Sequence, residues 1–151
     1  MIPEFIKIKN ALWPVLPPGI HMATLEEIKN RFATNSHRQR LYLGFSKGIY
    51  MLKQAGCKQV FLDGSYVTGK PKPNDYDVCW NTSGINEDKI DTVFWNFDNG
   101  RKAQKTKYLG EYFPAYITEG ETGKTFLDFF QMERNSGKTK GIIEILLGKI
   151  L

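Results

Sequence analysis

The chain has 151 residues, of which 41% are hydrophobic and 25% are charged. These values are typical of one globular domain with its own core, and they exclude a disordered chain or several independent domains. A net charge of +5 favours an anionic partner, which would be a nucleotide, a nucleic acid or an acidic protein. We therefore treat residues 1–151 as a single domain.

No apolar run approaches the length that a membrane span requires, and no secretory leader opens the sequence. The two cysteines, Cys57 and Cys79, do not have the spacing of metal ligands. We expect a cytoplasmic protein without a membrane partner, in which both thiols are reduced and fill apolar space in the core.

The first twenty residues are rich in proline, which disfavours a helix. They also carry several large apolar side chains, too many for a tail that is free in water. We expect residues 1–20 to be an arm that packs across the domain, with a short strand at residues 5–8. A segment that binds a partner is the alternative.

Two capping boxes, residues 24–27 (TLEE) and 36–39 (SHRQ), mark the starts of two helices. The second helix should continue to about residue 55, because apolar residues repeat at helical spacing and Gly56 then offers a left-handed end. Its first turn is basic, and these charges either contact an anion or form a solvated face. They are His37, Arg38 and Arg40, and we assign His37 no catalytic role.

The stretch from residue 60 to residue 80 carries the strongest functional signal. It reads as an apolar strand, a Gly64-Ser65 turn, a loop rich in glycine and proline, and a second strand that alternates polar and apolar residues. Side chains two residues apart in a strand point to the same face, so Asp75 and Asp77 should lie a few ångströms apart. Such charges repel unless a cation lies between them, and a divalent metal ion is the usual solution.

Residues 87–97 read as a helix with one apolar face, and a basic run follows at residues 100–107. The basic run predicts either a contact with an acceptor or a nucleic acid, with Tyr108 or Tyr112 available for base stacking, or a solvated surface. The lysines available for the contact are Lys102, Lys105 and Lys107. Glu111 is either an acid that supports the metal site or a structural residue.

Residues 115–118 and 125–131 read as two strands joined by a glycine-containing turn. Asp128 is the only charge of the second strand, and a lone carboxylate in an apolar strand is costly unless it has a partner. The metal ion held by Asp75 and Asp77 is the natural partner. The apolar run at residues 141–147 fits a helix or a strand, and we assign it as a strand. The elements together predict an α+β fold, in which helices pack on a small mixed β-sheet.

The order and spacing of Gly64-Ser65, Asp75-x-Asp77 and a later apolar strand with Asp128 resemble the nucleotidyltransferase superfamily of the DNA polymerase β type. The loop before Asp75 is similar to that of minimal nucleotidyltransferases of bacterial and phage toxin–antitoxin pairs. The chain departs from the family pattern in two ways. Asp63 stands where the family usually has an apolar residue, and residues 66–68 lack the arginines that often follow the Gly-Ser pair.

The resemblance implies a nucleotidyltransferase-like fold and Mg²⁺-dependent transfer of a nucleoside monophosphate from a nucleoside triphosphate to a hydroxyl group. The acceptor would be a partner protein such as a toxin, or an RNA such as tRNA, in a toxin–antitoxin or phage-defence setting. Asp75, Asp77 and Asp128 would be the catalytic residues and would bind two Mg²⁺ ions, for which Mn²⁺ can substitute. The nucleotide-binding residues would be Gly64, Ser65, Lys70 and Lys72.

Two other functions are compatible with the same residues. One is a catalytically inactive, antitoxin-like module of this fold, which binds a partner or nucleic acid through its basic surface and its arm. The other is a metal-dependent nuclease, against which Gly64-Ser65 argues because a nuclease needs no recognition of a terminal phosphate there. The three aspartates also have structural explanations as a turn residue, an edge-strand charge and an ion-pair partner. Their order and spacing favour the metal site.

Overall fold

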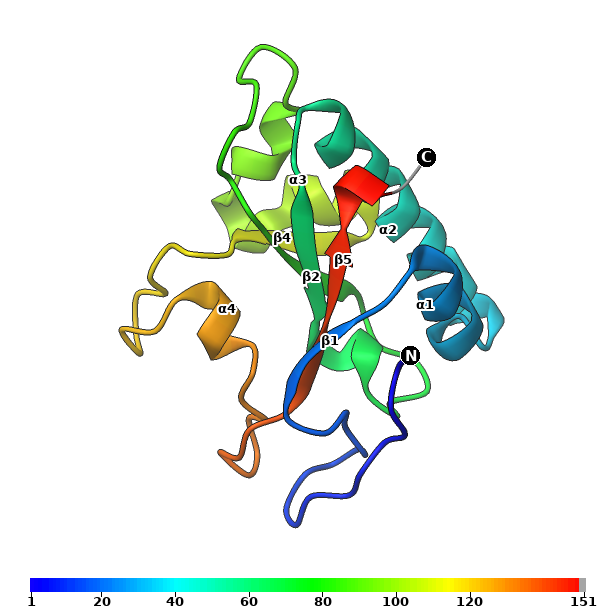
Figure 1. The fold of residues 1–151 in the computed structure, drawn as a ribbon. Coiled ribbons are helices and arrows are strands. Elements are labelled where there is room, and N and C mark those ends of the chain that lie inside the picture. The colour runs from blue at the N-terminus through cyan, green and yellow to red at the C-terminus, as the bar shows by residue number, and fades with distance from the viewer. Residues whose placement is uncertain (150–151) are drawn as a thin grey trace.

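The computed structural model describes residues 1–149, which form an α+β fold with one mixed five-stranded sheet. The sheet has the strand order β1-β5-β2-β3-β4 (Figure 1). Its strands are β1 (Gly19–Met22), β2 (Gln59–Asp63), β3 (Tyr76–Trp80), β4 (Gly110–Pro114) and β5 (Gly141–Leu146). The α-helices are α1 (Leu25–Phe32), α2 (Ser36–Gln54), α3 (Asp98–Tyr108) and α4 (Phe126–Phe129). Short 3₁₀ helices occupy η1 (Gly64–Val67), η2 (Thr92–Trp95) and η3 (Leu147–Lys149).

Strand register brings acidic residues together. β2 pairs antiparallel with β3 and with β5, whereas β1 pairs parallel with β5 and β4 parallel with β3. Asp63 lies opposite Asp77, and Asp77 lies opposite Glu111. Because directly paired residues of neighbouring strands share a face, three carboxylates line up across β2, β3 and β4.

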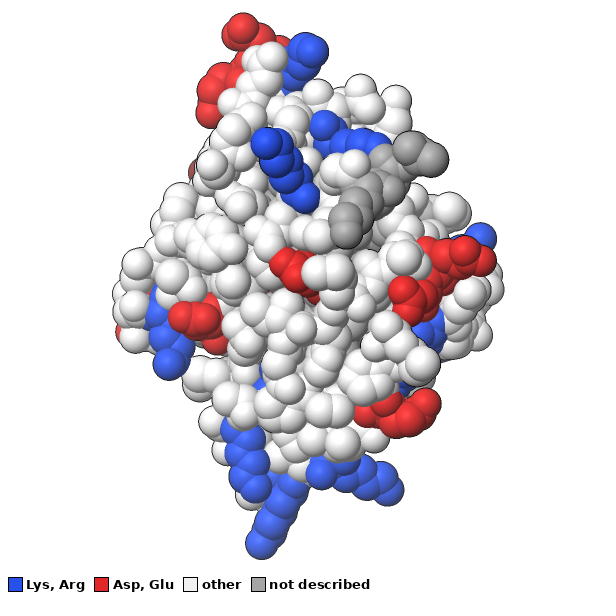
Figure 2. Space-filling view, in the orientation of Figure 1, with Lys and Arg blue, Asp and Glu red and all other residues white. Residues whose placement is uncertain are grey.

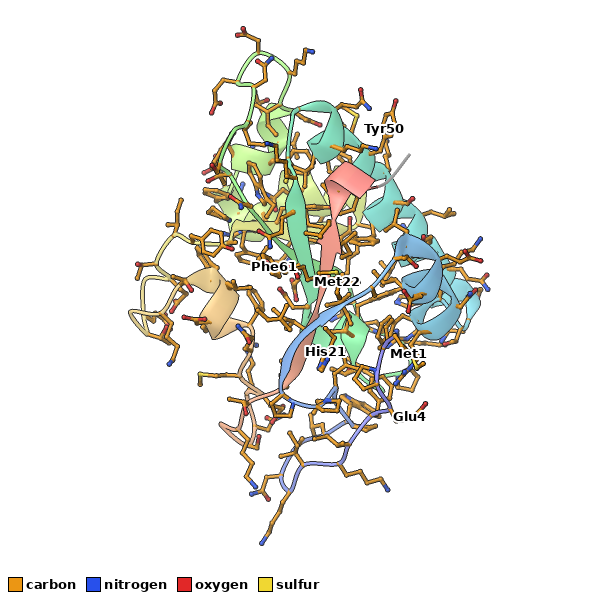
Figure 3. All side chains as sticks on the ribbon, viewed as in Figure 1. Met1, Glu4, His21, Met22, Tyr50 and Phe61 are labelled. Carbon is orange, nitrogen blue, oxygen red and sulfur yellow. The ribbon has the colours of Figure 1, made fainter. Side chains whose placement is uncertain are left out.

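The two faces of the sheet have separate cores. The larger core lies between the sheet and helices α1 to α3, and the smaller one lies between the opposite face and the segment that contains α4 (Figure 1). Phe61 projects from β2 into the smaller core (Figure 3). Two glycines allow α2 to approach the end of α3 and strand β4 closely. A Cβ at Gly44 would lie 2.2 Å from the Tyr108 carbonyl oxygen, and one at Gly48 would lie 1.9 Å from the Tyr112 hydroxyl.

Several elements confirm the expectations from sequence. α1 begins with the complete capping box of Thr24 and Glu27, and Gly56 follows α2 with a φ of +95°. β2, β3 and β5 lie where strands were expected, and both cysteines are free and buried. One start differs slightly: Asn35, not Ser36, is the N-cap of α2, because its side chain accepts the Arg38 backbone N–H.

Three predicted elements are wrong. Residues 115–118 form a turn and a bend that end in the single bridge of Thr118 with Thr125, instead of a strand. Residues 87–97 form turns and the short η2 instead of a helix, because the Asp91 side chain accepts the Val93 N–H and starts a new cap in the middle of the segment. Residues 125–131 form the short helix α4 instead of a strand, because Thr125 caps it by accepting the Asp128 N–H. β4, which carries Glu111, was not expected as a strand.

The N-terminal arm packs against the loop that follows β2. Ile6 and Val15 form a pair of backbone hydrogen bonds, and Val15 bridges in turn to Thr68. The strand expected at residues 5–8 is reduced to this single bridge at Ile6. Figure 2 shows Lys and Arg side chains projecting from the end of the molecule where the arm turns. Among the described residues, no helix is long and apolar enough to cross a membrane.

Candidate metal centre

The loop from Gly64 to Asp75 forms one wall of the site. Gly64 has a φ of +78°, and a Cβ at this position would lie 2.0 Å from the Asp77 Oδ2 atom. Glycine is therefore required for two reasons, the left-handed backbone and the close approach of the Asp77 carboxylate. The backbone then turns through η1, which places Ser65 beside the carboxylates at the edge of the same cleft.

Asp75, Asp77 and Glu111 form a carboxylate cluster. One oxygen of each lies within 4.8 Å of the others, and all three side chains are partly buried. Asp75 directly precedes β3 and Asp77 lies within it, whereas Glu111 comes from the paired position of β4. Glu111 also forms an ion pair of 3.3 Å with Lys105 of α3. The cluster thus joins two carboxylates from the start of β3 to a third from the neighbouring strand β4.

The cluster is electrostatically unfavourable by itself. Burial, followed by the charge of Glu111, raises the pKa of Asp75 to about 6. Burial, followed by the charges of Asp75 and Glu111, raises the pKa of Asp77 well above its usual range. Lys105 and Lys70 act in the opposite direction on the pKa of Asp75. A bound cation would remove this repulsion, which is the physical reason for expecting one.

The donor set fits a hard divalent cation. Ligand oxygens about 2.1 Å from one Mg²⁺ lie at most roughly 4.2 Å apart, so the observed spread of up to 4.8 Å needs only small side-chain adjustments. Oxygen-only ligands suit Mg²⁺ and Mn²⁺, whereas structural Zn²⁺ sites use mostly Cys and His. The absent side chain of Gly64 leaves the space that the Asp77 carboxylate occupies in the cluster.

Asp63 extends the acidic row into the interior. Its side chain is fully buried, and neither carboxylate oxygen has a hydrogen-bond partner among residues 1–149. Burial, followed by the charge of Asp77, raises the pKa of Asp63 well above its usual range, while Lys140 lowers it. Lys140 lines the cleft immediately before β5. The departure noted in the sequence at this position therefore adds a fourth carboxyl group next to the cluster.

The first turn of α2 anchors the loop. The Arg38 side chain is 4% exposed, and its guanidinium donates to the carbonyls of Phe32, Tyr66, Thr68 and Lys70 over 2.6–3.2 Å. The His37 ring donates to the Pro73 carbonyl, and the Asn35 amide donates to the Pro71 carbonyl at 2.9 Å. Arg38 is thus neither an anion contact nor part of a solvated face, because its guanidinium N–H groups are hydrogen-bonded to backbone carbonyls.

A cleft of about 970 Å³ opens in front of the cluster. Its walls come from the loop after β2, from α3, from β4 and from the segment around α4. Five cationic side chains line it: Lys70, Arg101, Lys105, Arg134 and Lys140. Cations placed around an acidic cluster give the cleft the charges needed for a polyphosphate whose metal ion is held by the carboxylates.

The structure brings together most of the residues that the sequence nominated. Gly64, Ser65, Lys70, Asp75, Asp77 and Lys105 all line the cleft. Lys72 is exposed and outside its lining, and so is Lys102. Lys107 also lies outside and pairs with Asp91 at 2.6 Å. Tyr108 and Tyr112 are fully buried, so neither can stack on a base.

Asp128 is not part of the cluster. It lies on α4 with an exposed side chain and is absent from both the carboxylate cluster and the cleft lining. The prediction that residues 125–131 supply the third carboxylate of the cluster is therefore wrong. Helical spacing turns Asp128 outward while its neighbours Phe126, Phe129 and Phe130 line the cleft.

Glu111 takes the third position, and its strand has no clear signal in the sequence. Residues 110–113 (GEYF) do not alternate polar and apolar side chains, which is the pattern of a half-buried strand. Arg101 and Lys140 were missed as well. The left-handed residues 99–101 at the start of α3 place Arg101 in the cleft, and the pairing of β5 within the sheet places Lys140 there.

Comparison with known proteins leaves the chemistry of the site as the main guide to function. The profile of a family of unknown function (DUF6932) matches residues 9–146. No curated protein and no solved structure matches the chain.

Proposed function

The chain belongs to this family of unknown function, and we propose that it is a Mg²⁺-dependent nucleotidyltransferase. It would move a nucleoside monophosphate from a nucleoside triphosphate to a hydroxyl group of a separate protein or RNA. The observation that carries the proposal is the Asp75, Asp77 and Glu111 cluster, which lies in one cleft with Gly64, Ser65 and several cations.

The carboxylates account for the metal requirement. Bound Mg²⁺ would stabilise the charge that develops on the entering and leaving oxygens of an in-line displacement. Asp75 and Asp77, two residues apart on one face, would hold a cation in common. Glu111 would support them from β4, in the role that the sequence predicts for Asp128.

The surrounding residues would hold the triphosphate. Gly64 and Ser65 offer backbone N–H groups and a hydroxyl at the end of β2, and Lys70 and Lys105 offer positive charge. In the reaction the acceptor oxygen bonds to the α-phosphorus, the bond from that phosphorus to the bridging oxygen breaks, and pyrophosphate leaves with the electron pair. The hydroxyl proton passes to water in the cleft.

The test compares wild type with the double variant Asp75→Asn/Asp77→Asn. Each protein is incubated with each α-labelled nucleoside triphosphate, Mg²⁺ or Mn²⁺, total RNA and a cell lysate. We expect label on RNA or protein, with release of pyrophosphate, from wild type alone. The double variant should stay folded, because the substitution removes two charges that burial disfavours.

Other results would contradict the proposal. RNA cleavage without a triphosphate would identify a nuclease. Absence of labelling together with absence of metal-dependent triphosphate binding would leave the inactive binding module as the explanation. In that case the double variant should bind the same partner as wild type.

A further inference from the structure

Four phenylalanines form what we call the aromatic wall of the cleft: Phe113, Phe126, Phe129 and Phe130. We propose that the aromatic wall is the stacking site for the planar base of the nucleotide. This inference rests on the proposed function, because the base is identified through the phosphates and metal ion to which it is attached.

The aromatic wall is continuous with the carboxylate cluster. Phe113 is two residues after Glu111 on β4, so both side chains lie on the face of the sheet that bears the cluster. The rings of Phe126 and Phe130 pack against Phe113 with centroid distances of 5.0 and 4.8 Å. A ligand held at the cluster by its phosphates therefore has the aromatic wall within the same cleft.

Of the four phenylalanines, Phe129 contributes least to the packing of the smaller core. Phe126 and Phe130 pack against the smaller core, whereas Phe129 is not part of that packing. Its ring meets Phe130 edge-on at a centroid distance of 5.2 Å and is partly exposed in the cleft. Apolar area left in water inside a charged cleft contributes to affinity only when a ligand covers it.

Arg101 adds polar groups to the aromatic wall, over the face of the Phe113 ring. Its guanidinium lies 3.9 Å from the Phe113 ring centroid, and its Nε–H donates to the Tyr112 carbonyl at 3.2 Å. Residues 99–101 hold this position with three consecutive left-handed conformations, with φ values of 52°, 63° and 60°. Asn99 and Arg101 are not glycine, so the backbone is strained in the segment that positions the Arg101 side chain against the aromatic wall.

A nucleotide base matches these features better than an aliphatic chain does. Stacking on aromatic rings needs a flat partner, and a guanidinium edge supplies hydrogen-bond donors to ring nitrogens and carbonyls. The mouth of the cleft carries charged side chains, including Glu119, Glu121 and Arg134, which a lipid tail would have to desolvate. We therefore expect a base on the aromatic wall and its phosphates toward Lys70 and Ser65.

The experiment measures Mg²⁺-dependent binding of the four nucleoside triphosphates and of inorganic tripolyphosphate by calorimetry. In wild type at least one nucleoside triphosphate should bind more tightly than tripolyphosphate. Phe129→Ala should weaken that nucleotide by roughly 5- to 150-fold, the range expected for base stacking on an aromatic ring. The affinity for tripolyphosphate should not change, and Phe129→Trp should retain nucleotide binding.

Tyr50→Ala is the matched control. Tyr50 is an aromatic residue of α2 with 60% exposure, and it lies outside the cleft (Figure 3). This variant should bind like wild type, and thermal unfolding should show that Phe129→Ala is folded.

Three other outcomes would contradict the stacking site. If wild type binds nucleotides and tripolyphosphate equally, or if Phe129→Ala weakens both alike, the base does not stack on the aromatic wall, while the phosphate site stands. If Phe129→Ala keeps nucleotide affinity but loses label transfer, the aromatic wall holds the acceptor instead. If neither ligand binds with Mg²⁺, both this inference and the proposed function are wrong.

Discussion

At the scale of single residues, Glu111 and Asp128 show which carboxylates belong to the proposed site. Both are carboxylates on the side of the sheet that α4 covers, but only Glu111 lies with Asp75 and Asp77. Asp128 is exposed on α4. The difference arises from strand pairing, since the register of β3 and β4 sets Glu111 opposite Asp77.

We predict that Glu111→Gln weakens Mn²⁺ or Mg²⁺ binding by at least tenfold, because it removes an anionic ligand from a cluster of three. Asp128→Asn is the matched control and should bind as wild type does. Calorimetry with either ion checks the prediction. Glu111→Gln also removes the ion pair with Lys105, but this loss changes the stability of the protein little, because the pair is partly exposed. If the two variants bind the metal ion with equal affinity, Glu111 is not a ligand of the site.

At the scale of elements, α2 determines the shape of the loop that carries the site. Its first turn binds the loop at Tyr66, Thr68, Lys70, Pro71 and Pro73, mainly through Arg38. The Tyr66 hydroxyl returns a hydrogen bond to the Arg38 carbonyl at 2.9 Å. A helix whose face packs on the sheet therefore also fixes the backbone between Ser65 and Asp75.

We predict that Arg38→Met lowers the free energy of unfolding by about 2–4 kcal/mol, because several buried carbonyls lose charged donors. Arg40→Met is the control, since Arg40 is exposed on the same turn. Chemical denaturation gives the stability, and hydrogen exchange of residues 66–75 should show local loosening in Arg38→Met alone. Unchanged exchange in this loop would mean that Arg38 does not hold it in place.

At the scale of the whole molecule, the acidic row couples folding to pH and to metal ions. Asp63, Asp75 and Asp77 all have raised pKa values in the folded protein, primarily through burial. The folded state therefore binds more protons than the unfolded chain above the ordinary aspartate value of 3.8. For such groups the free energy of unfolding falls as pH rises through the window between the two pKa values.

We predict that the melting temperature in EDTA falls between about pH 4 and pH 6, the window set by Asp75. Mg²⁺ should raise it more at pH 7.5 than at pH 5, because protonated carboxyl groups do not bind the ion. Asp75→Asn/Asp77→Asn should flatten both dependences. Thermal unfolding with and without Mg²⁺ provides the measurement. A melting temperature that rises with pH in EDTA would contradict the raised pKa values.

Local patterns in the sequence were sufficient for the parts of the site that lie close along the chain. Asp75 and Asp77 share a face because they are two residues apart, and Gly64-Ser65 follows a recognisable strand. The helix from residue 36 and β3 were also predicted, because their polar and apolar residues repeat with a helix or strand period. β2 and β5 were predicted from short apolar runs beside turn residues.

The tertiary structure decided which distant residues complete the site. Glu111 is 34 positions from Asp77, and only the pairing of β3 with β4 brings the two side chains together. Arg38 turned inward because the loop offers it carbonyls, and Asp128 turned outward because Thr125 starts a helix. The sequence alone thus determined the adjacent carboxylates and the glycine turn, whose geometry depends on neighbouring residues. The third carboxylate, the loop anchor and the aromatic wall depend on long-range pairing and packing, for which a single sequence carries no local signal.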